Sequence, residues 1–254
     1  METKKSFARG WGIVAFCFIG FLLTTFYDIL SPNVFVPALV STRGFSQANL
    51  MMAHSIGGIL GCLFGFYLGR IIKFKGAKGV LVISAILAGI NFIFIGVATT
   101  ELWCCVHIFL NEFLVLGYSL LTLISLISKW FPRKKGIIMG FVTSGSIGTG
   151  LFLLPLSDWL TRSSGIMIAQ LVMGLILLFF GVVAIFLVVE TPEELGLLPD
   201  NMPVTPEEAI QLQSAKGYVS PWTFRNILTP GPLLLILVCG GLITIGNLGI
   251  QTPG

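Results

Sequence analysis

Long apolar segments alternate with short polar ones along most of the chain. Each apolar segment has about the 20 residues that a helix needs to cross a hydrocarbon layer roughly 30 Å thick. Seven such segments lie at residues 11–36, 46–69, 78–99, 102–128, 137–160, 166–189 and 231–251. The pattern predicts an all-α membrane protein with six closely spaced spans and a seventh span set apart.

One long polar stretch, residues 190–230, separates the sixth and seventh apolar segments and holds six of the eleven acidic residues. Within it, Thr205, Pro206 and Glu208 have the spacing of a helix capping box, which predicts short helices in this stretch. We therefore expect three parts: a six-helix membrane domain at 1–189, a linker at 190–230 and the beginning of a second membrane domain at 231–254.

The composition agrees with the apolar pattern. Hydrophobic residues make up 55% of the chain and charged residues only 10%, whereas a soluble domain carries about 25% charged residues. A water-soluble globule, a disordered protein and a nucleic-acid-binding protein are therefore not expected. The long apolar run that follows the N-terminus does not resemble a cleavable signal peptide.

The basic residues predict the orientation of the spans. Eleven of the fifteen lie before span 1, between spans 2 and 3, or between spans 4 and 5, and only Arg43 and Arg162 lie on the opposite side. Because basic loops stay in the cytoplasm, we expect a cytoplasmic N-terminus and a cytoplasmic linker. The protein would be a multi-pass protein of the plasma (inner) membrane.

Two acidic residues lie deep within predicted spans, Asp28 in span 1 and Glu112 in span 4. Ionisable groups at membrane depth are costly and mark functional sites. No Lys or Arg lies deep in any span, so we expect neither acid to have a cationic partner within the membrane. Burial favours the protonated form of such a carboxyl group, which is a physical requirement for proton coupling.

Polar faces accompany both acids. In span 4 a stripe with helical spacing lies beside Glu112, and in span 1 Thr24 and Asp28 share a face. Such faces do not belong against lipid, so we expect a cavity between spans 1 and 4. The candidates for substrate or proton binding are Asp28, Glu112, Asn111, Tyr118, Thr24, Tyr27 and His54. The stripe itself consists of His107, Asn111, Tyr118, Thr122 and Ser125.

Small residues recur at intervals of four in spans 2 and 5. The two rows are Gly57, Gly61, Gly65 and Gly69, and Gly136, Gly140, Ser144 and Gly148. Small residues at this spacing allow helix backbones to approach closely. The rows predict close helix packing, with the partner helices left open.

The loop at residues 69–81 resembles the signature loop of the major facilitator superfamily, G-x-x-x-D-R-x-G-x-R. Gly69, Gly76 and Lys78 match this pattern, whereas Lys73 stands where the family has an acid. By resemblance this is a gating loop, with Gly69, Arg70, Lys73, Gly76 and Lys78 as its candidate residues. In the family the acid helps to latch the two halves, so its replacement alters the expected latch.

Two further segments are similar to the oxalate/formate-antiporter and monocarboxylate-transporter branch of that family. One is Lys129–Gly136 with the glycines that follow, and the other is Pro192–Asp200. The resemblance implies twelve helices in two six-helix halves, each half built from two three-helix repeats. It also implies that spans 1 and 4 line the central cavity and that the small-residue rows of spans 2 and 5 face the other half.

The function expected from this resemblance is secondary transport of a small solute by alternating access, coupled to protons or a counter-substrate. A monocarboxylate or similar organic anion is one solute, and a cationic or neutral solute is the alternative. The partners would be the solute, protons, the lipid bilayer and a C-terminal half that is missing here, because the chain ends inside span 7. A non-transporting membrane partner or truncated relic is the rival. No enzyme chemistry, cofactor, metal or nucleic acid is expected.

Overall fold

The computed structural model describes residues 2–195 and 199–201, with side chains at 9–195 and 199–200. The chain divides into two units, residues 1–203 and 204–254. The predicted capping box at 205–208 and the seventh span at 231–251 lie outside the described residues.

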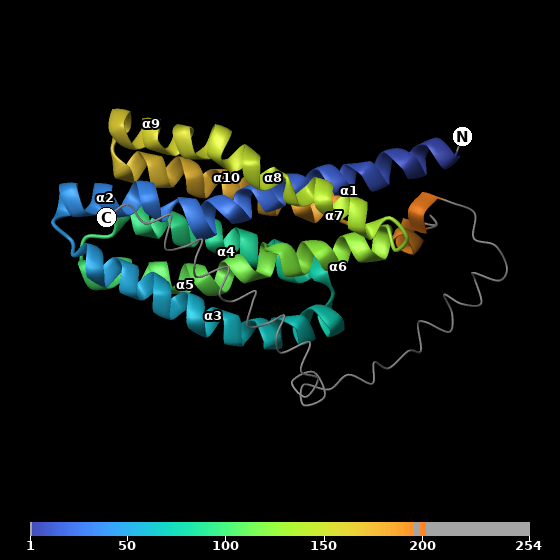
Figure 1. Ribbon diagram of the computed structural model, residues 1–254, viewed down its shortest axis with the longest axis horizontal. Coiled ribbons are helices and arrows are strands. Elements are labelled where there is room, and N and C mark those ends of the chain that lie inside the picture. Colours follow the sequence, from blue (N-terminus) through green and yellow to red (C-terminus); the bar gives the residue numbers. More distant parts are fainter. Residues whose placement is uncertain (1, 196–198, 202–254) are drawn as a thin grey trace. The chain divides into compact units, whose positions relative to one another are not determined.

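Six helical stretches are long and apolar enough to cross a membrane, and the described part of the chain contains no strand (Figure 1). The predicted all-α bundle of six spans is confirmed.

We number the spans 1 to 6 in chain order. Span 1 is α1 (Glu2–Thr25) with η1 (Phe26–Leu30), span 2 is α3 (Gln47–Lys75) and span 3 is α4 (Ala77–Val97). Span 4 is α5 (Glu101–Tyr118) with α6 (Leu120–Trp130); span 5 is α7 (Lys135–Thr143), α8 (Gly145–Gly148), η2 (Thr149–Leu153) and α9 (Leu154–Ser164); and span 6 is α10 (Ile166–Leu187). The shorter helices are α2 (Pro32–Arg43), η3 (Pro192–Leu195) and η4 (Pro199–Asn201).

Span 1 differs from its predicted range, because the helix changes geometry before residue 36. Residues Phe26–Leu30 form one π-helical turn, closed by a hydrogen bond from Ser31 N to Phe26 O at 2.8 Å. Pro32 then begins α2 at a first-turn position, where a helix has no need of its missing N–H group. Single π-turns inside helices are frequent at functional sites, and this one holds Asp28.

The helix starts follow local capping chemistry. Ser46 and Thr100 accept hydrogen bonds from the backbone N–H groups of Asn49 and Trp103, and so cap α3 and α5. Gly76 joins α3 to α4 with a φ of 85°, a backbone conformation that glycine adopts at little cost.

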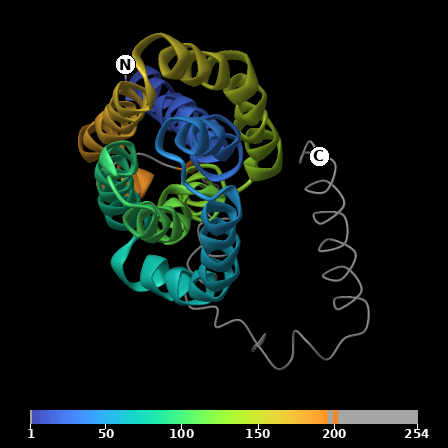
Figure 2. The same cartoon turned by 90° about the vertical axis from the view of Figure 1, so that its left-hand side faces the viewer.

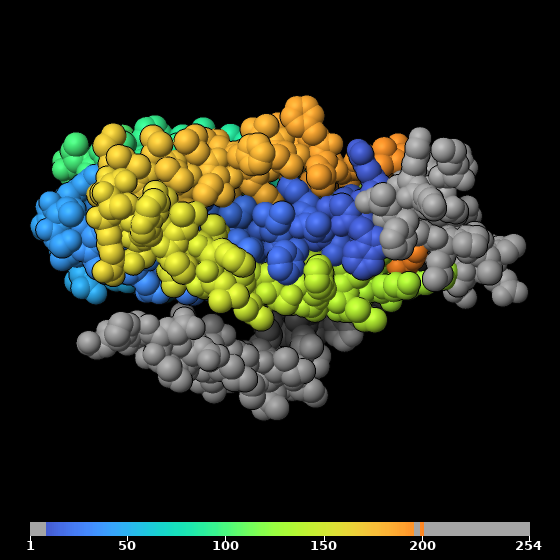
Figure 3. Space-filling model, turned by 90° about the horizontal axis from the view of Figure 1, so that it is seen from above, coloured from blue at the N-terminus to red at the C-terminus, as the bar shows by residue number. Residues whose placement is uncertain are grey.

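The spans pack in a symmetric pattern, seen nearly end on in Figure 2. Span 3 packs extensively against span 6, span 2 against span 4, and span 1 against span 5. In the space-filling view α1 lies between α10 and the span formed by α7 to α9 (Figure 3). Exchanging spans 1, 2 and 3 with spans 4, 5 and 6 converts the pair of spans 2 and 4 into the pair of spans 5 and 1, and leaves the pair of spans 3 and 6 as it is. Span 3 also packs extensively against span 4, whereas the corresponding contact between spans 6 and 1 is slight. The three pairs fit two three-helix repeats related by an approximate two-fold axis.

Candidate functional site

A cavity of about 310 Å³ lies among spans 1, 2 and 4 and brings the two membrane-depth acids together. Asp28 reaches it from the π-turn η1 and Glu112 from the middle of α5, while Thr24 and Ser119 add hydroxyl groups. Among the described residues that line this cavity, none is Lys or Arg. We call it the large cavity.

Asp28 forms no hydrogen bond or ion pair with any residue that the structure describes. Its carboxyl group is therefore not committed to holding the bundle together. A membrane-depth acid that lines a cavity without a partner is available to bind a solute cation or a proton.

Glu112 differs from Asp28 because it has a partner. The Nδ1 atom of His54, in α3, lies 2.8 Å from Oε1 of Glu112. The prediction excluded a Lys or Arg partner and did not foresee this imidazole, which is a cation only when it is protonated. The two residues stand 58 positions apart, and only the packing of α3 against α5 brings them together.

Most of the polar stripe faces the interior of the bundle rather than the large cavity. Asn111 donates from Nδ2 to the backbone oxygen of Tyr27 at 3.2 Å, and Tyr27 donates from its hydroxyl group to the backbone of Met173. The hydroxyl group of Tyr118 is buried without a partner among the described residues. Asn111, Tyr27 and Tyr118 therefore do not line the large cavity as expected, whereas Thr24 does.

The small-residue rows do not behave as single surfaces. A Cβ atom at Gly57 would lie 2.7 Å from Cγ of Glu112, and one at Gly148 would lie 2.8 Å from Leu22 Cδ1. Gly57, Gly61 and Gly148 thus pack against spans 4 and 1 of this bundle, which corrects the expectation that they face another half. A Cβ atom at Gly65, Gly69, Gly136 or Gly140 would have no atom within 4 Å, and Ser144 is exposed.

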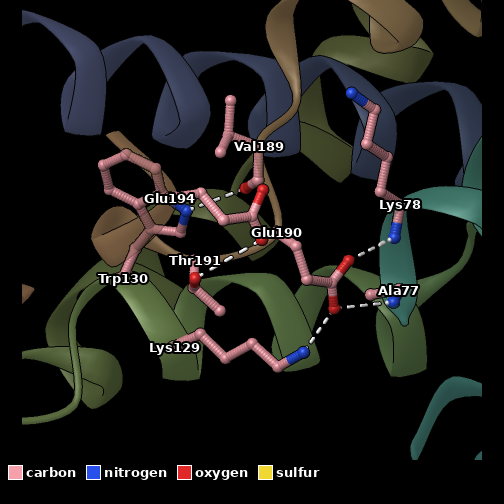
Figure 4. A network of polar contacts seen from close by, with 8 residues as sticks. All are labelled: Ala77, Lys78, Lys129, Trp130, Val189, Glu190, Thr191 and Glu194. Atoms are coloured by element: carbon pink, nitrogen blue, oxygen red, sulfur yellow. Dashed lines mark hydrogen bonds and ion pairs between the residues drawn. The ribbon is translucent and has the colours of Figure 1, made fainter. Parts of the chain in front are cut away.

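A network of polar contacts joins three segments at the end of the bundle that carries the basic loops (Figure 4). Glu190, just after span 6, accepts hydrogen bonds from the N–H groups of Ala77 and Lys78, both at 2.8 Å, and pairs with Lys129. Trp130 donates from Nε1 to the backbone oxygen of Val189 at 3.0 Å. The predicted loops between spans 2 and 3 and between spans 4 and 5 therefore lie at the same end.

Sequence reasoning missed Glu190. Of the gating-loop residues, Lys78 donates its backbone N–H to Glu190, and a Cβ atom added at Gly76 would lie 3.0 Å from Glu190 Oε2, whereas Arg70 and Lys73 are exposed. The available signal was its position, the first acid after span 6. Glu190 supplies a carboxylate to the loop in which Lys73 replaces the family's acid.

We expect Glu190→Gln to loosen this end of the bundle. Burial opposes ionisation of Glu190, but Lys129 and the two N–H groups outweigh it and hold the pKa of Glu190 below its ordinary value. A lowered folded-state pKa contributes stability above the unfolded pKa, roughly 4.3, and this stability is lost as the pH falls through the folded pKa. The protection factors of the Ala77 and Lys78 amides, which are their exchange rates corrected for the intrinsic rate at each pH, should fall in the variant, and in the wild type as the solution becomes acidic.

The exposed Glu193 provides the matched control. Glu193→Gln should leave amide exchange at Ala77 and Lys78 unchanged. Equal exchange in the wild type and Glu190→Gln would show that the network does not stabilise the loop.

Metal binding has no candidate in the described part, because no three His, Cys, Asp or Glu side chains are grouped to hold an ion.

The family model described as Major Facilitator Superfamily matches residues 16–253, and no curated protein matches the chain.

Proposed function

The chain belongs to the major facilitator superfamily, and from this premise we propose that it moves a small solute across the membrane by alternating access, driven by protons. The observation that carries the proposal is the large cavity, where Asp28 and Glu112 meet without Lys or Arg among the described lining residues. A solute site near the membrane midplane between repeats is typical of secondary transporters. The protein would act as a carrier and not as an enzyme.

The coverage of the spans supports a further membrane domain as the partner. In spans 2 and 5 only 22% and 28% of the apolar window is buried, against 39–50% in the other four. We propose that the open glycines Gly65, Gly69, Gly136 and Gly140 face that domain. We also propose that the protein lies in the plasma (inner) membrane, with the basic end of the bundle on the cytoplasmic side.

The solute has two candidate classes. The resemblance to the oxalate/formate and monocarboxylate branch favours an organic anion. The described cavity lining favours a cationic or neutral solute, because it holds two carboxyl groups and no Lys or Arg. An anion therefore requires a basic residue from outside the described part, whereas a cation pairs directly with Asp28.

The proposal is tested with the protein in liposomes that contain a pH-sensitive dye. Organic anions, organic cations and neutral solutes are added in turn under an imposed proton gradient. Solute-dependent proton flux identifies the class. Absence of flux with every solute in a protein that is correctly folded would favour the non-transporting membrane partner.

Cys62 offers a direct probe, because it is exposed and lines the large cavity. In a variant with Cys105 and Cys239 replaced by Ser, we expect maleimide to label Cys62. Solute at ten times its dissociation constant should slow this labelling roughly tenfold, because the labelling rate is proportional to the unoccupied fraction of the sites.

The half-buried Cys105, which does not line the large cavity, provides the control. In a variant that retains Cys105 while Cys62 and Cys239 are replaced, solute should give no protection. Equal protection at both positions would mean that the solute does not bind in the large cavity.

A further inference from the structure

A second cavity, of about 10 Å³, lies beside Glu112 and is lined also by Asn111, His54 and Tyr27. This volume is on the order of the space that one water molecule needs. Glu112 lines both cavities. Its Oε1 atom contacts His54, which lines the small cavity. Its Oε2 atom lies near Gly58, which lines the large cavity, at 3.8 Å from where a Cβ atom added to Gly58 would be.

Asn111 presents an unsatisfied acceptor at the small cavity. Its side chain is 5% exposed, and its Nδ2 atom already donates to Tyr27. Its Oδ1 atom has no partner among the described residues. A buried oxygen without a hydrogen bond costs about 1–3 kcal/mol, so an ordered water that donates to Oδ1 would stabilise this arrangement.

His54 connects the buried acid to more accessible surroundings. Its side chain is 29% exposed, whereas that of Glu112 is 6% exposed. It lies two helical turns from the start of α3, at the end opposite Lys73 and Lys75. A proton that reaches His54 can therefore pass to Glu112 without crossing the large cavity.

From this geometry we infer that the small cavity holds one water molecule bound by Asn111 Oδ1, and that this water and His54 form the route by which Glu112 exchanges protons. The inference rests on the proposed proton-driven transport and assigns different tasks to the two acids. Glu112 carries the proton, and Asp28, which has no partner among the described residues, is left to meet the solute.

The transfer is balanced without another reactant. When Nε2 of His54 takes a proton from a hydronium ion, an O–H bond of that ion breaks and water is left, while Nδ1 releases its proton to Oε1 of Glu112. An N–H bond forms at Nε2, the N–H bond at Nδ1 breaks and an O–H bond forms on the carboxyl group. The imidazole is then neutral, as its other tautomer.

Few other titratable groups of the described residues face Glu112. From η1 they are Asp28 and Tyr27, from α3 His54 and Cys62, and from its own helix Tyr118. On α4 the only titratable side chain is Lys78, in the first turn.

The test uses the purified full chain in lipid nanodiscs without any solute, and protons are the only probe. Infrared absorption follows the protonated carboxyl band that Glu112→Gln removes, after a rapid drop in pH. His54→Gln can still donate a hydrogen bond to Glu112 but does not carry a proton. We expect it to slow the rise of this band at least about tenfold, and Asn111→Leu to remove a water O–H band that shifts in H₂¹⁸O.

His107→Gln is the matched control, because His107 lines neither cavity. Its Nδ1 atom lies 2.6 Å from Oδ1 of Asn91 instead. It should leave both signals unchanged. A wild-type rate in His54→Gln would overturn the route, and a water band that persists in Asn111→Leu would overturn the water site.

Should His54→Gln fail to fold, Asn111→Leu decides the inference: loss of the water band together with slower protonation supports it, and an unchanged rate overturns it. No solute is present, so these results do not depend on whether transport is found. Proton-driven uptake with a wild-type protonation rate in His54→Gln would retain the proposed function and reject only this inference.

Discussion

Asp28→Asn and Glu112→Gln will each abolish proton-driven solute flux. Both acids line the large cavity, and Asp28 has no hydrogen bond or ion pair among the described residues. An amide neither ionises nor carries a proton. Losing one buried charged interaction with a solute or proton costs about 3 kcal/mol, which corresponds to a loss of roughly 100-fold. The measurement is flux in liposomes under a proton gradient, normalised to the amount of folded protein.

Asp158→Asn is the matched control. Asp158 is an acid in span 5 whose partner, Arg162, lies four residues further along the exposed face of the same helix at 2.8 Å. An exposed pair of this kind contributes little to stability, so the flux should persist. Unchanged flux in both Asp28→Asn and Glu112→Gln would remove the two acids from the mechanism, whatever the control gives.

The two acids could be found from the sequence because their signal is local. Each is a charge inside an apolar segment, so depth follows from counting residues along a helix. Their shared cavity also follows once spans 1 and 4 are assigned to the same wall. The sequence does not predict the π-turn at Phe26–Leu30. Its hydrogen bonds are shifted by one residue relative to an α-helix, but over only five residues this does not change the spacing of apolar positions visibly.

The partners of these acids could not be found in the same way. His54 meets Glu112 across 58 residues, and Glu190 meets Ala77 across 113. Hydrophobic periodicity shows which face of a helix is apolar but not which helix covers it. The polar stripe of span 4 was therefore assigned to the cavity, although Asn111 and Tyr118 point into the bundle.

The glycines show the same limit most clearly. The regular rows of small residues in spans 2 and 5 predict close helix packing, but in parts of those rows no atom lies within 4 Å of an added Cβ atom. The tightest reciprocal contact lies instead between spans 3 and 6. A Cβ atom on Gly89 would lie 2.8 Å from the backbone oxygen of Gly174, and one on Gly174 would lie 2.7 Å from that of Gly89. This reciprocity is what a two-fold axis between the repeats requires.

Gly89→Leu and Gly174→Leu will therefore destabilise the bundle by about 3 kcal/mol each, because overpacking a filled contact against backbone forces the helices apart. Helix propensity alone predicts the opposite sign, since Leu stabilises a helix interior relative to Gly by up to about 1 kcal/mol. The midpoint of thermal unfolding in detergent should fall in both variants. The sign of the shift thus separates packing from propensity.

Gly79→Leu, on the same helix α4 as Gly89, provides the control. A Cβ atom at Gly79 has no atom within 4 Å, so only propensity acts and the unfolding midpoint should stay or rise. A rise in Gly89→Leu equal to that in Gly79→Leu would mean that spans 3 and 6 are not in close backbone contact. The two repeats would then have to meet along another pair of helices.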